Sequence, residues 1–132
     1  MRNHVFHLAI PVGDLGEARR FYVTQLGCKL ARTYPDRITL DFFGDQVVCH
    51  LTEMAPVTEP LSLYPRHFGA TFYNSEDFDL LVELARLRKI RFFRDVATRF
   101  EGMAEVHRVF VLQDPFGNLL EFKNYRDPRM VY

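Results

Sequence analysis

Short segments of alternating apolar and polar residues fill much of the first part of the chain, and one segment of helical spacing interrupts them. The short segments predict strands over residues 5–12, 29–34, 37–43 and 46–51. After the first of these strands, apolar residues recur every three or four positions from Leu15 to Leu26, which predicts a helix. Asp14 and Glu17 fit a capping box at its start, and Gly27 suits its end.

The same order of elements recurs after residue 65. Strands are predicted over residues 66–73, 90–100, 106–113 and 119–125. A helix is predicted to begin at Ser75 after the cap Asn74, because Glu76 and Asp77 follow where the helix dipole favours acidic residues. Residues 52–65 hold three of the seven prolines and no sustained periodicity, so we expect a connector there.

The chain therefore predicts a single domain of α+β class, made of two βαβββ modules. The boundaries are residues 4–51 for module one, 52–65 for the connector and 66–125 for module two. Residues at corresponding places in the two modules match, because His7 and His67 each lie seven residues before a helix cap. Residues 43–44 and residues 116–117 are both Phe-Gly, and both pairs precede the last strand of a module.

Length and composition narrow the function classes. A chain of 132 residues suffices for one domain with a proper core. The formal net charge is zero, from 17 basic and 17 acidic residues, so we expect no nucleic-acid partner. No apolar stretch approaches the roughly 20 residues needed to cross a bilayer, so we expect no membrane association and a cytoplasmic location. Cys28 and Cys49 are too few for a disulfide framework and are expected to be reduced.

Four side chains of metal-binding type fall at corresponding strands of the two modules. His7 and His67 lie in the first strands, and His50 and Glu121 lie in the last strands. The surrounding strand residues are mainly apolar, and an ionised glutamate on a buried face costs free energy unless it is paired or bound to a metal. Imidazole and carboxylate suit Fe(II), Ni(II), Zn(II) and related divalent ions. A lone strand histidine is more often a packing residue, but four such residues at matched strands favour a metal site.

Four segments of the chain resemble the vicinal oxygen chelate superfamily, which includes glyoxalase, bleomycin-resistance proteins and extradiol dioxygenases. They are residues 6–12, 18–22, 26–28 and 114–122. The most specific part is the closing pattern Asp-Pro-x-Gly-Asn-x-x-Glu, which ends at Glu121. The resemblance implies that the two modules form a half-open barrel around one divalent metal, which chelates two neighbouring oxygens of a small-molecule substrate. It also implies a homodimer.

The ligand set divides this superfamily by reaction. Extradiol dioxygenases use two histidines and one glutamate, which His7, His67 and Glu121 match. Glyoxalase I adds a fourth ligand from the last strand of the first module, where His50 stands instead of the usual glutamate. The resemblance therefore implies catalytic roles for Glu121, as a metal-bound carboxylate, and for His50, as a fourth ligand or a general base.

The leading interpretation is a non-haem Fe(II) dioxygenase, with Fe(II) as the favoured metal and Ni(II), Zn(II) or Mn(II) as alternatives. A glyoxalase-like lyase or isomerase using Ni(II) or Zn(II) is the second interpretation. The third, from another class, is a small-molecule binding or resistance protein without turnover, although the full ligand set argues against it.

Three further polar residues are candidates for substrate binding. Arg99 lies beside the Gly102 loop and could hold a substrate carboxylate, although a surface ion pair is the simpler interpretation. His107 is a candidate acid or base, or an exposed strand histidine. Tyr125 lies four residues beyond Glu121 in the same predicted strand, and its alternative role is packing of the C-terminal tail.

Overall fold

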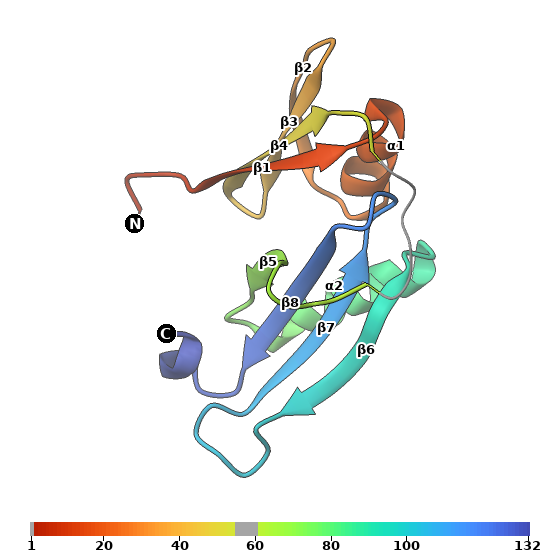
Figure 1. Cartoon of the computed structure of the whole chain (residues 1–132). Coiled ribbons are helices and arrows are strands. Elements are labelled where there is room, and N and C mark those ends of the chain that lie inside the picture. Colours follow the sequence, from red (N-terminus) through yellow and green to blue (C-terminus); the bar gives the residue numbers. More distant parts are fainter. Residues whose placement is uncertain (1, 55–60) are drawn as a thin grey trace. The chain divides into compact units, whose positions relative to one another are not determined.

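The computed structural model describes residues 2–54 and 61–132, which form an α+β structure (Figure 1). Contacts divide the chain into two compact units. The first comprises Met1–Pro60 with Pro115–Asn118, and the second comprises Leu61–Asp114 with Leu119–Tyr132. Each unit holds one four-stranded mixed sheet and a helical segment that follows the first strand of that sheet.

The sheet of the first unit has the strand order β1-β4-β3-β2. Its elements are β1 (His7–Val12), α1 (Leu15–Arg19), the π-helical turn η1 (Arg20–Gln25), β2 (Lys29–Thr33), β3 (Arg37–Phe42) and β4 (Asp45–Leu51). Strand β1 runs parallel to β4, whereas β4 with β3 and β3 with β2 are antiparallel. Helix α1 contacts β3 and β4, and the core includes Ile38, Leu40 and Cys49, which are at most 2% exposed.

The first helical segment differs from the single helix that the sequence predicts. Its start is confirmed, because the side chain of Asp14 accepts a hydrogen bond of 2.8 Å from the backbone of Glu17. The regular α-helix ends at Arg19, however, and the chain continues as a π-helical turn in which the Leu26 amide donates to the Phe21 carbonyl at 2.8 Å. The apolar spacing of so short a segment does not separate the two helical periods, so the sequence could not reveal this wider turn.

The second unit repeats the arrangement with the strand order β5-β8-β7-β6. Its elements are β5 (Phe68–Thr71), α2 (Ser75–Leu87), β6 (Phe92–Arg99), β7 (His107–Gln113), β8 (Leu119–Tyr125) and the short 3-10 helix η2 (Pro128–Val131). Strand β5 runs parallel to β8, and the other neighbours are antiparallel. The same strand order in both units agrees with the expected duplication.

Helix α2 covers one face of the second sheet and so determines which residues occupy the other face. Phe78 of α2 lies 5.1 Å from Phe110 between ring centroids, and Phe110 lies 5.3 Å from Phe122 of β8. Side chains alternate between the two faces of a strand. Glu121 and Lys123, on either side of Phe122, therefore point to the face opposite α2.

All eight expected strands are present, and the predicted α+β class is confirmed. Strand β5 is shorter than expected and begins at Phe68, so His67 immediately precedes the strand instead of lying within it. The expected module boundaries stay a prediction, and residues 55–60 of the expected connector lie outside the described residues. The closure of the sheets around one metal also stays a prediction.

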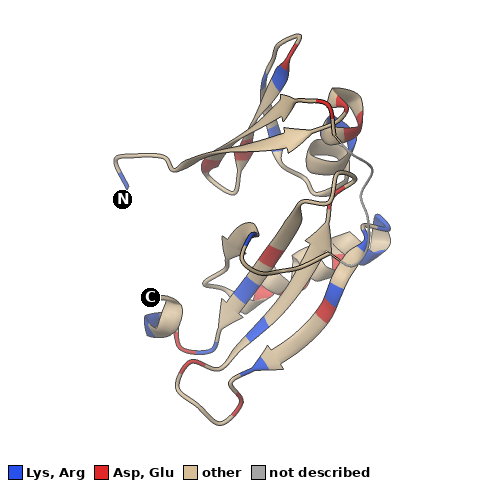
Figure 2. Cartoon of the chain, in the orientation of Figure 1, with Lys and Arg blue, Asp and Glu red and all other residues tan. Residues whose placement is uncertain are grey.

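Charge is mixed on both units, in agreement with the formal net charge of zero (Figure 2). In β6, Arg94 stands next to Asp95, and in β8 Glu121 stands two residues before Lys123. Among residues 2–54 and 61–132, no helix is long and apolar enough to span a membrane.

Candidate metal centre

His67 and Glu121 are brought together in the second unit. The Nε2 atom of His67 lies 3.6 Å from the Oε1 atom of Glu121, and their side chains are only 25% and 12% exposed. Two ligands bonded at about 2.0–2.2 Å to one ion stand roughly 3.0–3.5 Å apart at common coordination angles. The pair is therefore spaced almost as two ligands of the same metal ion are.

Glycine is required at the strand position that brings this pair together. Gly69 of β5 is the register partner of Glu121 in the parallel ladder with β8. A Cβ atom at Gly69 would overlap the backbone carbonyl oxygen of Glu121. The close approach of the two backbones therefore depends on the absence of a side chain at this position.

The imidazole of His67 is held by a backbone carbonyl. Its Nδ1 atom lies 2.8 Å from the carbonyl oxygen of Leu63, which can only accept, so Nδ1 carries the proton. In a neutral imidazole, Nε2 is then an acceptor, and it faces a carboxylate oxygen that is also an acceptor. A cation between the two would satisfy both lone pairs. Leu63 is 3% exposed and packs with Val111 and Leu119, which fixes the carbonyl that orients the ring.

His7 has a similar arrangement within the first unit. It is the first residue of β1, and its Nδ1 atom lies 3.3 Å from the side-chain amide oxygen of Gln46, its register partner on β4. That oxygen can accept the Nδ1 proton, which leaves Nε2 open for a metal. The side chain of His7 is exposed. The sequence indicated His7, but not the role of Gln46.

The strand register separates His50 from His7. His7 is opposite Gln46, whereas His50 lies four residues further along β4 and is opposite Pro11. Four residues of a strand span about 13 Å. The nitrogen atoms of two histidines bound to one ion lie within about 4 Å of each other, so the two side chains would have to bridge most of that span. The register therefore separates the backbones of His50 and His7 along the strand, and the expectation that His50 binds the same ion stays a prediction.

Counting from the turn glycines identifies the residue that corresponds to Glu121 in the first unit. Glu121 lies four residues after Gly117, and Val48 lies four residues after Gly44. Val48 is apolar and 8% exposed, so it offers no ligand atom. The repeated Phe-Gly pair already aligned Val48 with Glu121 in the sequence. Matching the modules by strand alone had aligned His50 with Glu121 instead.

Arg99, His107 and Tyr125 form one row across the second sheet, because His107 is the register partner of both Arg99 on β6 and Tyr125 on β8. His107 is 8% exposed, its ring centroid lies 4.4 Å from that of Tyr125, and its Nδ1 atom donates to the Glu105 carbonyl oxygen at 2.8 Å. The structure therefore brings together the three residues that the sequence proposed for substrate binding.

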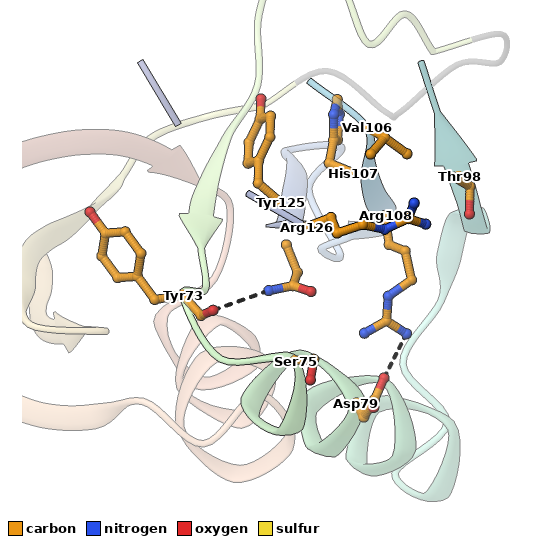
Figure 3. A pocket seen from close by; sticks show the side chains of 10 residues that line it. Tyr73, Ser75, Asp79, Thr98, Val106, His107, Arg108, Tyr125 and Arg126 are labelled. Atoms are coloured by element: carbon orange, nitrogen blue, oxygen red, sulfur yellow. Dashed lines mark hydrogen bonds and ion pairs between the residues drawn. The ribbon is translucent and has the colours of Figure 1, made fainter. Parts of the chain in front are cut away.

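An open pocket of about 500 Å³ adjoins this row at the end of the second unit (Figure 3). Its lining residues are Tyr73, Ser75, Asp79, Thr98, Val106, His107, Arg108, Asn124, Tyr125 and Arg126. Arg108 donates to Asp79 of α2 at 2.7 Å, and the Asn124 side chain donates to the Tyr73 carbonyl oxygen at 3.5 Å. The lining includes neither His67 nor Glu121, so this pocket is separate from the candidate metal ligands.

The two cysteines offer no further metal site. Both are buried, and neither forms a disulfide within the described residues. Burial, with a smaller contribution from Asp41, raises the pKa of the Cys28 thiol to about 12. Within the part of the chain that the structure describes, no group of three or more His, Cys, Asp or Glu side chains converges. The His67–Glu121 pair therefore offers two ligands and leaves a third to be identified.

Comparisons with known proteins agree with the fold. The family model for the Glyoxalase/Bleomycin resistance protein/Dioxygenase superfamily matches residues 4–122 of the chain. Among solved structures, a glyoxalase/bleomycin resistance protein/dioxygenase from Alicyclobacillus acidocaldarius is 61% identical, with a TM-score of 0.92. That match covers 98% of this chain and 97% of the other. A search of curated proteins finds no match.

Two more distant structures share the fold alone. The fosfomycin resistance protein FosX from Listeria monocytogenes is 13% identical with a TM-score of 0.72, over 99% of this chain and 100% of that one. A lactoylglutathione lyase from Agrobacterium tumefaciens is 15% identical with a TM-score of 0.66, over 93% of this chain and 94% of that one. These two neighbours carry different chemistries, so the fold does not select one reaction.

Proposed function

Because the chain belongs to the Glyoxalase/Bleomycin resistance protein/Dioxygenase superfamily, we propose that it is a metal-dependent enzyme acting on a small organic substrate. One divalent ion is held by His7, His67 and Glu121, and the substrate presents two neighbouring oxygens to that ion. We leave His50 out of this ligand set, because it lies four residues beyond Gln46, the register partner of His7, along β4.

The facing acceptors of His67 and Glu121 are the observation that carries this proposal. A histidine nitrogen and a carboxylate oxygen at 3.6 Å, both largely shielded from water, repel each other unless a proton or a cation lies between them. The hydrogen bond from Nδ1 of His67 to Leu63 is the outer contact that metal-bound histidines commonly make.

Neighbouring groups of the chain orient the proposed metal ligands. When bound, the ion supplies a Lewis acid that polarises substrate oxygens. The Leu63 carbonyl fixes the ring of His67, and the Gln46 amide does the same for His7. Glu121 is 12% exposed, so its carboxylate exchanges little with water and is held ready as a ligand. In a reaction that moves a substrate proton, this carboxylate is the proposed base.

Two histidines and one carboxylate favour a non-haem Fe(II) dioxygenase as the reaction class. That ligand set characterises Fe(II) oxygenases, which keep coordination positions open for substrate and dioxygen. Val48 occupies the position that would supply a fourth ligand and offers none. Fe(II) is therefore the favoured ion, and Mn(II), Ni(II) or Zn(II) would fit the same nitrogen and oxygen donors.

A glyoxalase-like lyase or isomerase using Ni(II) or Zn(II) is the second candidate. His50 favours it, because His50 and Gln46 share one face of β4 and Gln46 contacts His7. A histidine on the face of a metal ligand could transfer a proton without binding the ion. A binding protein without turnover is the third candidate.

A homodimer is proposed as the assembly. Strands β1 and β2 are the edges of the first sheet, and β5 and β6 are the edges of the second. Val5 and Phe6, just before the edge strand β1, are 60% and 61% exposed. Exposed edges and apolar side chains of this kind are commonly covered by a second copy.

Oxygen uptake tests the reaction class. The protein is reconstituted anaerobically with Fe(II), and dioxygen consumption is followed with a panel of catechols. The account predicts consumption that matches catechol loss with Fe(II), and none with the redox-inert Zn(II) control. Proton-transfer turnover by Ni(II)- or Zn(II)-loaded protein, without dioxygen uptake by the Fe(II) form, would favour the lyase instead.

A further inference from the structure

We propose that Lys123 binds an anionic group of the substrate, so that the substrate class is a small organic acid with two neighbouring oxygens. This inference rests on the proposed function, because it places the anionic group relative to the metal ligand Glu121. Lys123 was not among the residues that the sequence singled out, since a lysine in an exposed strand commonly just faces water.

Three successive rows cross the face of the second sheet that lies opposite α2. Glu121 is paired with Val111, and the next row pairs Lys123 with Val109. The third row contains Tyr125. Register partners in antiparallel strands share a face, and successive rows are about 6.7 Å apart. Lys123 therefore lies between the candidate metal ligand and the row of Tyr125, on the face that α2 does not cover.

Lys123 lies on this face, and none of the ion pairs among the described residues includes it. Its side chain is half-buried, and its Nζ atom lies 5.6 Å from the centroid of the Tyr125 ring. Within residues 2–54 and 61–132, its ammonium group makes no ion pair and no hydrogen bond. The ring contact orients the ammonium group but leaves its charge unneutralised.

Four acidic residues of the second unit contact groups other than Lys123. Three of them pair with arginines: Asp79 with Arg108 at 2.7 Å, Asp95 with Arg86 at 2.6 Å, and Asp127 with Arg129 at 2.9 Å. Glu121 faces His67 instead. The half-buried ammonium group of Lys123 is therefore electrostatically suited to binding an anionic group of a ligand.

The row spacing limits the shape of the ligand. Because the ammonium group leans toward Tyr125, an anionic group bound by Lys123 would lie at least about one row, roughly 7 Å, from oxygens held beside Glu121. The rings of His107 and Tyr125, 4.4 Å apart between centroids, occupy the next row and limit the length of the ligand. The site therefore favours a short acid whose charge is separated from the chelating oxygens by one ring or a few bonds.

A matched pair of catechols tests this inference. The acid probe is a catechol that carries a carboxymethyl group opposite one hydroxyl, and the neutral probe is the corresponding carboxamide. Both are titrated calorimetrically, without oxygen, into Zn(II)-loaded protein of measured metal content. Because a charge-assisted hydrogen bond distinguishes them, the wild type should bind the acid about tenfold more tightly than the amide.

Variants assign that preference to the ammonium group. Lys123→Met should bind both probes alike, with unchanged affinity for the amide, and Lys123→Arg should keep the preference. Lys29→Met, which removes the same charge from β2, should behave as the wild type. Equal affinity of the wild type for both probes, or an unchanged preference in Lys123→Met, would overturn the role of Lys123 alone. Failure of both probes to bind would instead overturn chelation by the ion, and the proposed function with it.

Discussion

The Nε2 atom of His67 faces the Oε1 atom of Glu121 at 3.6 Å, and the other ring nitrogen of His67 is committed to the Leu63 carbonyl oxygen at 2.8 Å. This relationship joins the residue before β5 to the middle of β8 through the parallel ladder at Gly69. The sequence indicated the two side chains separately, and the structure places the two atoms that could bind a metal next to each other.

Loss of the His67 imidazole should weaken metal binding. In His67→Ala, one of the three proposed ligands is absent, so metal affinity should fall by at least about tenfold, as even the loss of an outer contact to a ligand costs ten- to hundredfold. Competition with a chromogenic chelator measures the affinity. The matched control is His4→Ala, which removes an exposed histidine that contacts Asn3. Equal affinities of His67→Ala and wild type would remove His67 from the site.

His50 should not be needed for metal binding. Because its position in β4 is about 13 Å beyond that of Gln46, His50→Ala should keep the metal affinity of the wild type. The same chelator competition measures this, and activity is followed in parallel. Retained metal with lost turnover would give His50 the role of a base. A marked loss of metal would show that the register argument is wrong.

Gly69→Ala should destabilise the second unit. The added Cβ atom would overlap the Glu121 carbonyl oxygen, which is backbone and cannot turn aside. Separating β5 from β8 should lower the free energy of unfolding by about 1–3 kcal/mol. Urea denaturation measures the loss.

Gly13→Ala is the control for Gly69→Ala. Its Cβ atom would meet only side-chain atoms at 3.6 Å or more, so the change should stay within about 0.5 kcal/mol. Equal stabilities of the two variants would mean that the ladder at Gly69 is not tightly packed.

The buried thiol of Cys28 should make stability depend on alkaline pH. Burial raises its pKa from 9.0 to about 12, so the unfolded thiol ionises first as the pH rises. The stabilisation is complete below pH 9 and is lost between pH 9 and about 12. Between pH 8 and pH 10, the free energy of unfolding should therefore fall by about 1 kcal/mol more in the wild type than in Cys28→Ala. Parallel pH dependences of the two proteins would contradict this.

The order of strands could be predicted because the alternation of side chains and the turn residues are local signals. The cap at Asp14 was predictable for the same reason, since its hydrogen bond reaches only to Glu17. The π-helical turn was not, because the change from one helical period to another occupies only Arg20–Gln25.

The candidate site was predictable only in part. Residue type and strand position indicated His67 and Glu121, but the register that places Gln46 opposite His7, and His50 four residues further on, depends on counting from the turn. The role of the Leu63 carbonyl could not be predicted, because a backbone group leaves no trace in the residue type. Lys123 was missed because its significance depends on the partial burial of its side chain beside the Tyr125 ring, which the residue type does not show.

The metal content of wild type and Glu121→Ala tests the central claim most directly. Both are purified anaerobically, supplied with Fe(II), passed through a desalting column and measured by elemental analysis, with Glu101→Ala as an exposed control. The account predicts about one ion per chain for the wild type and the control, and almost none for Glu121→Ala, since a methyl group offers no ligand. Full occupancy in Glu121→Ala would contradict the assignment of this site.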